Sequence, residues 1–281
     1  MTDPEILQSC ARGEISPQIA LSRLLLSGRA VDVAQLERAA TAQPGAPPLA
    51  ALARLAARHS DRLDALGRLA RSGLWPDGAD FRAATAALFD RLADEAPEAG
   101  VAFYAFGDPE DLAAATDEVM AVIRAWAPPA GRRAVDFGCG IGRVAIALAG
   151  EAESVLGLDL SAGMIAAARR RAGARRTLDF AQNGDGVWPL ADGTVDLVIA
   201  VDSLPYVVQA NGLAAFMAEA ARVLRPGGDL LVFNWSYRSD PERDCAEAHG
   251  LAAAHGFALL RAGARPFTIW DGTGFHLRRC P

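Results

Sequence analysis

The sequence predicts an α/β protein in which an all-α region comes first and a mostly parallel β-sheet follows. Two observations lead to this class. Residues 1 to about 128 carry apolar side chains at helical spacing and no convincing strand, whereas from Arg132 onward short apolar runs alternate with helical segments. Continuous apolar strands separated by helices are typical of a parallel sheet with helices on both faces.

The first half consists of helix signals separated by breaks. Ser16-Pro17 reads as an N-cap with proline at the first helical position. After the proline-rich break at 44–48, leucines recur at helical spacing, which indicates a buried helix face. Asp108-Pro109 opens another helix, which we expect to end before the Pro/Gly linker at 127–131.

The second half offers strands and helices in alternation. Short apolar runs predict strands at 134–137, 155–158, 177–181, 195–201 and 229–235. A helix is expected at 209–224, and the tail offers a helix near 241–254 and candidate strands at 257–264 and 273–279. An antiparallel pair at the sheet edge is one arrangement for the two tail strands.

The charge balance disfavours a nucleic-acid partner. The formal net charge is -6, and the arginines are scattered apart from a run at 169–176. We interpret that run as the solvent face of a helix end, where cations also suit the helix dipole. A nucleic-acid footprint is usually larger and more basic.

The cysteines and the N-terminus indicate a reduced compartment. Cys10, Cys139, Cys245 and Cys280 are far apart and form no CxxC, so neither a disulfide framework nor a metal site is predicted. The first residues form no signal peptide, and no apolar run has the length of a membrane span. We therefore expect a cytoplasmic protein with no membrane partner.

A glycine-rich turn carries the strongest functional signal. In VDFGCGIGR, residues 135–143, a strand ends, alternating glycines turn the chain, and a helix begins. Glycine permits left-handed backbone and a close approach of ligand to main chain. Such a turn lies where open α/β sheets bind ligands, and Asp159, at the end of the next strand, can accept hydrogen bonds from both hydroxyls of a ribose.

A dinucleotide site is the main alternative for this turn. Residues 140–145 satisfy G-x-G-x-x-A, and Asp159 falls near the spacing that NAD-binding folds use. Asp136, however, puts an acid just before the turn. A negative charge there suits a cationic ligand with an ammonium and a sulfonium group, and it ill suits a pyrophosphate. A NAD-dependent oxidoreductase is therefore the weaker hypothesis.

From about residue 101 to residue 279 the chain resembles the class I S-adenosylmethionine-dependent methyltransferases, in their small-molecule-modifying branch. The resemblance rests on an ordered set of motifs: VDFGCGIGR, VLGLDLSAGMIAAAR, WPLADGTVDLVIAVDSLPYV and ARVLRPGGDLLVF. It implies a doubly wound, Rossmann-like sheet of seven strands with the last strand antiparallel. We accordingly assign residues 1–100 to a helical N-terminal region and 101–281 to the methyltransferase domain.

The resemblance also implies roles for residues of the cofactor site. Asp159 would hold the ribose of S-adenosylmethionine, with Leu160 and Met164 against its adenosine. Four residues of the turn would wrap the methionine part: Asp136, Gly138, Cys139 and Gly140.

Three more features complete the expected cofactor site. The family places an acid or amide near the adenine amino group, and here Asn183, Gly184 and Asp185 occupy that region with the register left open. A plain Asn-Gly turn would explain the same residues. The backbone after Val201 would face the amino end of the cofactor, and Tyr104 would close the pocket.

Candidates for acceptor contact follow the fourth strand. Asp202 is the first candidate for an acceptor ligand or base, although a loop role is an alternative, and Tyr206 follows it. Amino-group methyltransferases often carry an Asn/Asp/Ser-Pro-Pro-Tyr/Phe tetrad here; the segment 203–206 lacks its first proline, so N-methylation stays open. Four further side chains are candidates for the acceptor pocket or, alternatively, for the core: Trp235, Tyr237, Trp270 and His276.

The expected activity is methyl transfer from S-adenosylmethionine to an O, N, S or C atom of a small-molecule acceptor, by in-line displacement without a metal. A cofactor-binding protein that has lost turnover is the alternative, and a protein acceptor is a third hypothesis. The N-terminal helices would serve as a substrate lid or as a homodimer interface.

Overall fold

The computed structural model describes residues 2–73, 75–76, 80–183 and 186–281. Its internal contacts divide the chain into two compact units. The first comprises Met1–Pro76, Glu98–Ala115 and Phe267–Asp271, and the second comprises Asp77–Pro97, Thr116–Pro266 and Gly272–Pro281.

The first unit is built of short helices. They are α1 (Asp3–Ala11), α2 (Pro17–Leu26), α3 (Val33–Ala42), α4 (Pro47–Arg58), α5 (Leu63–Arg71), α7 (Pro97–Val101) and the 3₁₀ turn η1 (Phe103–Ala105). Ser16 caps α2 as expected, since its side chain accepts a hydrogen bond from the backbone N–H of Ile19. The leucines after the 44–48 break do form a buried helix face, because Leu49 and Leu52 of α4 are buried.

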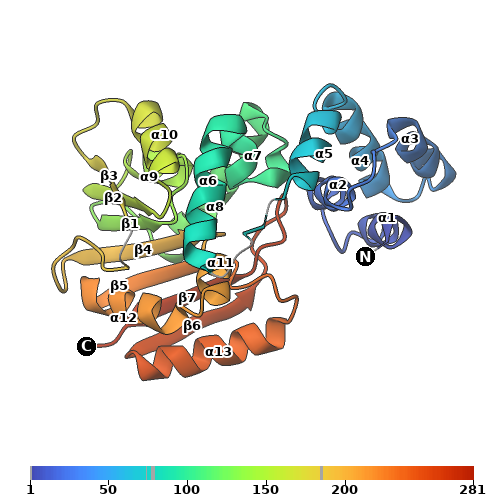
Figure 1. Ribbon diagram of the computed structural model, residues 1–281. Helices are drawn as coiled ribbons and strands as arrows, with labels where there is room; N and C mark the ends of the chain where they lie inside the picture. The colour runs from blue at the N-terminus through green and yellow to red at the C-terminus, as the bar shows by residue number, and fades with distance from the viewer. Residues whose placement is uncertain (1, 74, 77–79, 184–185) are drawn as a thin grey trace. The chain divides into compact units, whose positions relative to one another are not determined.

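The second unit contains a seven-stranded sheet in the order β3-β2-β1-β4-β5-β7-β6 (Figure 1). Its strands are β1 (Arg133–Phe137), β2 (Ser154–Asp159), β3 (Leu178–Gln182), β4 (Val195–Val201), β5 (Leu224–Phe233), β6 (Phe257–Ala264) and β7 (Gly274–Arg279). Strands β1 to β5 pair in parallel, and β7 is antiparallel to both β5 and β6. The predicted fold class is confirmed.

Helices cover both faces of this sheet. The helices of this unit are α6 (Phe81–Glu95), α9 (Arg143–Leu148), α10 (Ala162–Ala172), α11 (Leu204–Gln209), α12 (Leu213–Val223), α13 (Pro241–Ala254) and the end of α8 (Pro109–Trp126). Figure 1 shows α9 and α10 on one face and α12 and α13 on the other. Strand β4 is buried along its whole length, as its unbroken apolar sequence predicts.

Two local predictions differ from the structure. The single helix expected at 209–224 is interrupted: α11 ends at Gln209 and α12 begins at Leu213, because Asn211 takes a left-handed backbone with φ of 54°. The strand expected at 229–235 is β5, which begins earlier at Leu224 and ends at Phe233, and residues 225–228 form a bulge in it, since Val195 pairs with Leu224 and Leu197 with Asp229.

The two units do not divide at residue 100. Helix α6 belongs to the sheet-bearing unit, where it packs on α10, and residues 98–115 belong to the helical unit. The role of residues 1–100 as a lid or dimer interface stays a prediction.

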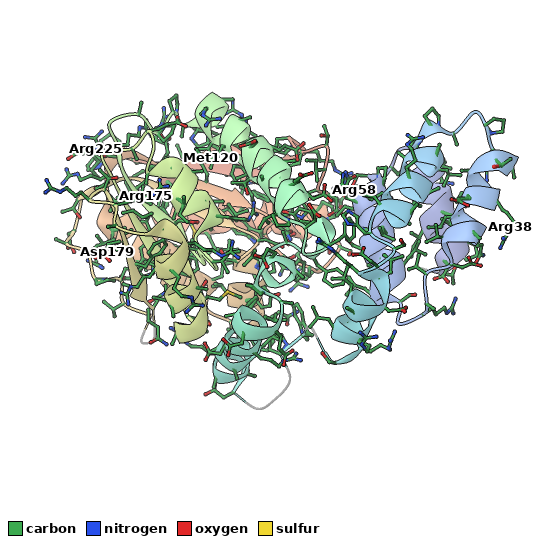
Figure 2. All side chains as sticks on the ribbon, turned by 90° about the horizontal axis from the view of Figure 1, so that it is seen from above. Arg38, Arg58, Met120, Arg175, Asp179 and Arg225 are labelled. Atoms are coloured by element: carbon green, nitrogen blue, oxygen red, sulfur yellow. The ribbon has the colours of Figure 1, made fainter. Side chains whose placement is uncertain are left out.

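The arginine run lies at the C-terminal end of α10. Arg169, Arg170 and Arg171 occupy its last turn and are exposed, which fits the expected solvent face. Figure 2 shows Arg175 and Arg225 at the periphery of the second unit.

Candidate functional site

The glycine turn joins β1 to α9 at the point where the strand order reverses. Strand β1 lies between β2 and β4, so the turn opens at the carboxyl end of the topological switch point. The backbone N–H groups of Gly138 and Cys139 both donate to the carbonyl of Leu158, at 2.7 and 2.9 Å. Gly138 and Gly140 have φ of 71° and 53°, a conformation that glycine adopts without strain. The turn is thereby fastened to the end of β2.

Asp136 anchors the turn from inside the fold. Its side chain is buried, and Oδ2 accepts a hydrogen bond of 2.9 Å from the backbone N–H of Ala145 in the first turn of α9. Burial raises the pKa of Asp136 to about 7, although the nearby Arg143 acts in the opposite direction. The contact shows a capping role for α9; a role around the methionine part of a cofactor stays a prediction.

Asp159 connects the turn to the helix that follows β2. Its Oδ2 accepts from the backbone N–H of Gly140 at 2.8 Å, and its Oδ1 accepts from the backbone N–H of Ser161 at 2.9 Å. Burial raises its pKa, and the backbone N–H groups of Ser161, Gly140 and Leu160 act in the opposite direction. A carboxylate offers about four lone-pair sites, so both oxygens keep acceptor capacity for a ribose.

Asn183 lies beside Asp159 at the end of β3. Its backbone N–H donates to the carbonyl of Asp159 at 2.8 Å, and the residue is only 7% exposed. Its side-chain Oδ1 is buried without a hydrogen-bond partner among the described residues. A buried acceptor without a partner is costly, so this oxygen suits an amino group of a ligand such as adenine. Gly184 and Asp185, the alternatives for this contact, lie outside the described residues.

Leu160 and Met164 flank this region. The backbone carbonyl of Leu160 accepts from Nε2 of Gln182 at 3.0 Å, and Met164 is fully buried in the first turn of α10. Cys139 is also buried, and its Sγ would lie 3.0 Å from a β-carbon on Gly157. Met164 and Cys139 are thus buried near the turn, and the contacts of all three residues with a cofactor stay predictions.

A second polar group forms beyond β4 and β5. Val201 ends β4, and Asp202 follows it with a left-handed φ of 55°. Oδ1 of Asp202 accepts from Nδ2 of Asn234 at 2.6 Å and from the Tyr237 hydroxyl at 2.9 Å. Non-glycine residues in this conformation often mark functional sites.

Tyr206 extends this group into an aromatic corner. Its ring meets that of Tyr237 edge-on at 5.9 Å and that of Phe89 at 5.2 Å. Burial raises the pKa of Tyr206, and the Asp202 carboxylate raises it further, while a hydrogen bond with Tyr237 lowers it. Asp202, Tyr237 and Tyr206 thus form one connected network, which brings the two predicted catalytic residues together.

The other aromatic candidates lie elsewhere. Trp235 and His276 are 0% and 1% exposed, so they belong to the core and do not line a pocket. His276 contacts Oδ1 of Asp229 through Nε2 at 2.8 Å. Tyr104 stacks on Trp270 at 5.8 Å within the first unit, and its closing of a cofactor pocket stays a prediction.

Sequence reasoning missed Asn234 as the partner of Asp202. Its position directly after β5 repeats that of Asp202 after β4, and neighbouring parallel strands end at one edge of the sheet. The sequence therefore contained a signal that could have identified Asn234. Within the described part of the chain, no cluster of three or more His, Cys, Asp or Glu side chains suits a metal, and no helix is long and apolar enough to cross a membrane.

Comparison with known proteins agrees with this geometry. Residues 134–228 match the family described as Methyltransferase domain. The chain is 32% identical over 117 residues to a demethylmenaquinone methyltransferase of Clavibacter sepedonicus, a match that covers 42% of this chain and 46% of that protein. It is 38% identical over 122 residues to a ubiquinone/menaquinone biosynthesis C-methyltransferase of Dinoroseobacter shibae, covering 41% and 47%. The matches thus span less than half the length of these curated relatives.

A solved structure shows the same fold. Phosphoethanolamine N-methyltransferase 1 of Haemonchus contortus, in complex with phosphoethanolamine and S-adenosylhomocysteine, superposes with a TM-score of 0.57 and 18% identity over 72% of this chain and 49% of that one. The family match spans the glycine turn, Asp159 and Asp202 within the observed sheet. Residues 134–228 thus match a methyltransferase domain, and the sheet that holds them has the fold of a solved methyltransferase.

Proposed function

We propose that this chain transfers a methyl group from S-adenosylmethionine to an O, N, S or C atom of a small-molecule acceptor. The observation that carries the proposal is the pairing of Asp159 with Asn183. A carboxylate with spare acceptor capacity lies beside a buried amide oxygen that has no partner among the described residues. The two match the ribose hydroxyls and the adenine amino group of an adenosine.

The remaining cofactor contacts follow from position. The cofactor supplies a methyl group already activated on positively charged sulfur. Leu160 and Met164 would flank the adenosine, the backbone after Val201 would face the amino end, and Gly184 or Asp185 would serve as alternatives to Asn183. The methionine part would lie along the turn made by Asp136, Gly138, Cys139 and Gly140.

Asp202 would act at the acceptor. Its Oδ1 is held by Asn234 and Tyr237, so its orientation is fixed before a substrate arrives. A carboxylate fixed in this way can orient an acceptor in line with the methyl group, and it can take a proton where the acceptor must lose one. Tyr206 would line the same place.

The relatives indicate where an acceptor screen should begin. Three of them are named as methyltransferases of demethylmenaquinone, ubiquinone/menaquinone biosynthesis and 2-methyl-6-phytyl-1,4-hydroquinone. Quinols and other aromatic small molecules are therefore the first acceptor class to test. A cytoplasmic location, a homodimer through the helical unit and the absence of a nucleic-acid partner stay predictions.

Calorimetric titration tests the proposal. S-adenosylmethionine, S-adenosylhomocysteine and NAD are titrated into the wild type, Asp159→Asn, Asp159→Ala and the control Asp192→Asn, whose side chain is 80% exposed. We expect both sulfur ligands to bind the wild type and the control, and to bind Asp159→Ala far more weakly. Asp159→Asn keeps an acceptor for Gly140, so circular dichroism of both variants separates lost binding from lost folding.

The outcomes divide the hypotheses. If neither sulfur ligand binds, or if NAD alone binds tightly, the proposed methyltransferase activity is contradicted. Binding without methyl transfer across a broad acceptor screen, read by mass spectrometry, would favour the non-catalytic alternative.

A further inference from the structure

Helix α6 carries two polar side chains that reach the loops after β2 and β3. Oδ1 of Asp90 accepts from the Ser161 hydroxyl at 2.6 Å and from the backbone N–H of Gly163 at 2.8 Å. One end of the helix is thus fixed to the start of α10. Nearer the other end, Nη2 of Arg82 donates to the backbone carbonyl of Asn183 at 2.7 Å.

The contact between α6 and α10 is close as well as polar. A β-carbon on Gly163 would lie 3.1 Å from Cα of Asp90 and 3.2 Å from Cβ of Ala93, so a larger residue there would fit only if α6 moved slightly away from α10. Ser161 also caps α10 by accepting from the backbone N–H of Met164. The charge of Asp90 therefore lies at the N-terminus of α10, where the helix dipole favours an anion.

At both ends, α6 contacts a residue that hydrogen-bonds to Asp159. The backbone N–H of Ser161 donates to Oδ1 of Asp159, and the backbone N–H of Asn183 donates to its carbonyl. Asp90 thus reaches Asp159 through Ser161, and Arg82 reaches it through Asn183. Asp90 also acts on Asp159 through space, because its negative charge contributes to the raised pKa of Asp159.

We propose that Asp90 and Arg82 are positioning residues for cofactor binding, and that α6 fastens the two loops on the adenosine side of the site. The inference rests on the proposed function. Arg82 fixes the backbone of Asn183, whose amide oxygen would meet the adenine, while Asp90 fixes the loop that presents Asp159 to the ribose. Because a cofactor would stabilise both loops, its binding should in turn stabilise the docked α6.

A matched pair of variants on α6 tests this. Asp90→Ala removes the contacts with Ser161 and Gly163, whereas Asp94→Ala changes an exposed side chain one turn further along the same helix. Affinity and release of S-adenosylhomocysteine are measured by calorimetry and stopped-flow. We expect Asp90→Ala to bind roughly tenfold more weakly through faster release, as the loss of a charge-assisted hydrogen bond implies, and Asp94→Ala to behave as wild type.

Amide hydrogen exchange supplies a readout apart from affinity. We expect the α6 amides of the wild type to gain protection when S-adenosylhomocysteine binds, and Asp90→Ala to lose most of that gain. Should Asp90→Ala fail to fold, Arg82→Ala tests the other end of the helix by the same two measurements.

The results separate the two proposals. If the wild type does not bind S-adenosylhomocysteine, the proposed function fails and this inference fails with it. If the wild type binds but the Asp90→Ala or Arg82→Ala variant keeps wild-type affinity and protection, the function stands and α6 is merely a packing helix.

Discussion

A β-carbon on Gly138 would lie 2.2 Å from Cβ of Ser203. The first glycine of the turn after β1 is thereby packed against the residue that follows Asp202 after β4. Ser203 returns the contact, because its hydroxyl donates to the carbonyl of Phe137 at 2.8 Å. The two sides of the topological switch point are joined here, so Gly138 is required both by its φ of 71° and by its neighbour.

Replacement of Gly138 by alanine should therefore destabilise the fold more than strain alone explains. A left-handed alanine costs about 1–2 kcal/mol, and the overlap with Ser203 adds to it. Gly131→Ala is the control, since Gly131 has a similar φ of 68° and nothing within 4 Å of its β-carbon position. Chemical denaturation measures both, and the additional substitution Ser203→Gly should recover part of the difference. Equal losses in Gly138→Ala and Gly131→Ala would mean that the turn relaxes around the new methyl group.

The unfolding free energy of the protein should change with pH because of Asp136. Its pKa of about 7 in the folded state exceeds the value near 4 of an unfolded aspartate, so the folded state holds the extra proton. Its contribution is therefore greatest at low pH and is lost as the pH rises from about 4 to about 7, by an amount on the order of a few kcal/mol. Asp136→Asn should flatten that part of the curve of unfolding free energy against pH. If Asp136→Asn shifts the whole curve without changing its slope in this pH range, the raised pKa of Asp136 is contradicted.

Much of the sheet could be predicted because each strand is a short apolar run between turn signals. Strands β4 and β6 have the expected bounds, β1 differs by one residue at one end, and β2 and β3 differ by one residue at each end. The errors fall where local signals compete. The break at Asn211 falls on an Asn-Gly dipeptide, a turn signal that competes with the helical spacing after it, and the bulge 225–228 depends on pairing with β4, which a single strand does not reveal.

The candidate site could be predicted where a polar residue directly follows a strand. Asp159, Asn183 and Asp202 each follow a strand directly, so their place at the sheet edge could be inferred from the topology. The contacts of Asp90 and Arg82 could not be inferred from the topology. They lie on a helix more than 70 residues upstream of their partners, and nothing in the periodicity of α6 distinguishes a face that docks on α10 from an ordinary buried face.

Asp229 should stabilise the fold without affecting the cofactor. It is buried in β5 directly after the bulge 225–228, and it accepts from Arg132 at 2.7 Å, Arg278 at 2.9 Å and His276. Burial raises the pKa of Asp229, but these hydrogen bonds outweigh it and lower the pKa to about 2.

Asp229→Asn should therefore cost about 3 kcal/mol of unfolding free energy at pH 7, since it removes the buried anion that pairs with Arg132 and Arg278. A depressed pKa also means that the contribution is present above about pH 4 and is lost as the pH falls toward 2. Denaturation at several pH values measures both effects, with Asp192→Asn as the exposed control. Titration with S-adenosylhomocysteine should show unchanged affinity, and a large loss there would mean that the network supports the site after all.

Removal of the Tyr237 hydroxyl should change catalysis more than binding. Tyr237→Phe deletes one of the two donors to Oδ1 of Asp202 and leaves Asn234 as the other. Because these donors hold the Asp202 carboxylate in place, the loss of one should let it turn away from the acceptor. With an acceptor found in the screen, we expect kcat to fall roughly tenfold while the affinity for S-adenosylhomocysteine stays within a factor of about two. Tyr206→Phe is the companion variant, and its effect on kcat should be smaller because its hydroxyl reaches Asp202 through Tyr237. An unchanged kcat in Tyr237→Phe, or a loss of S-adenosylhomocysteine affinity as large as the loss of kcat, would contradict a role of this network at the acceptor.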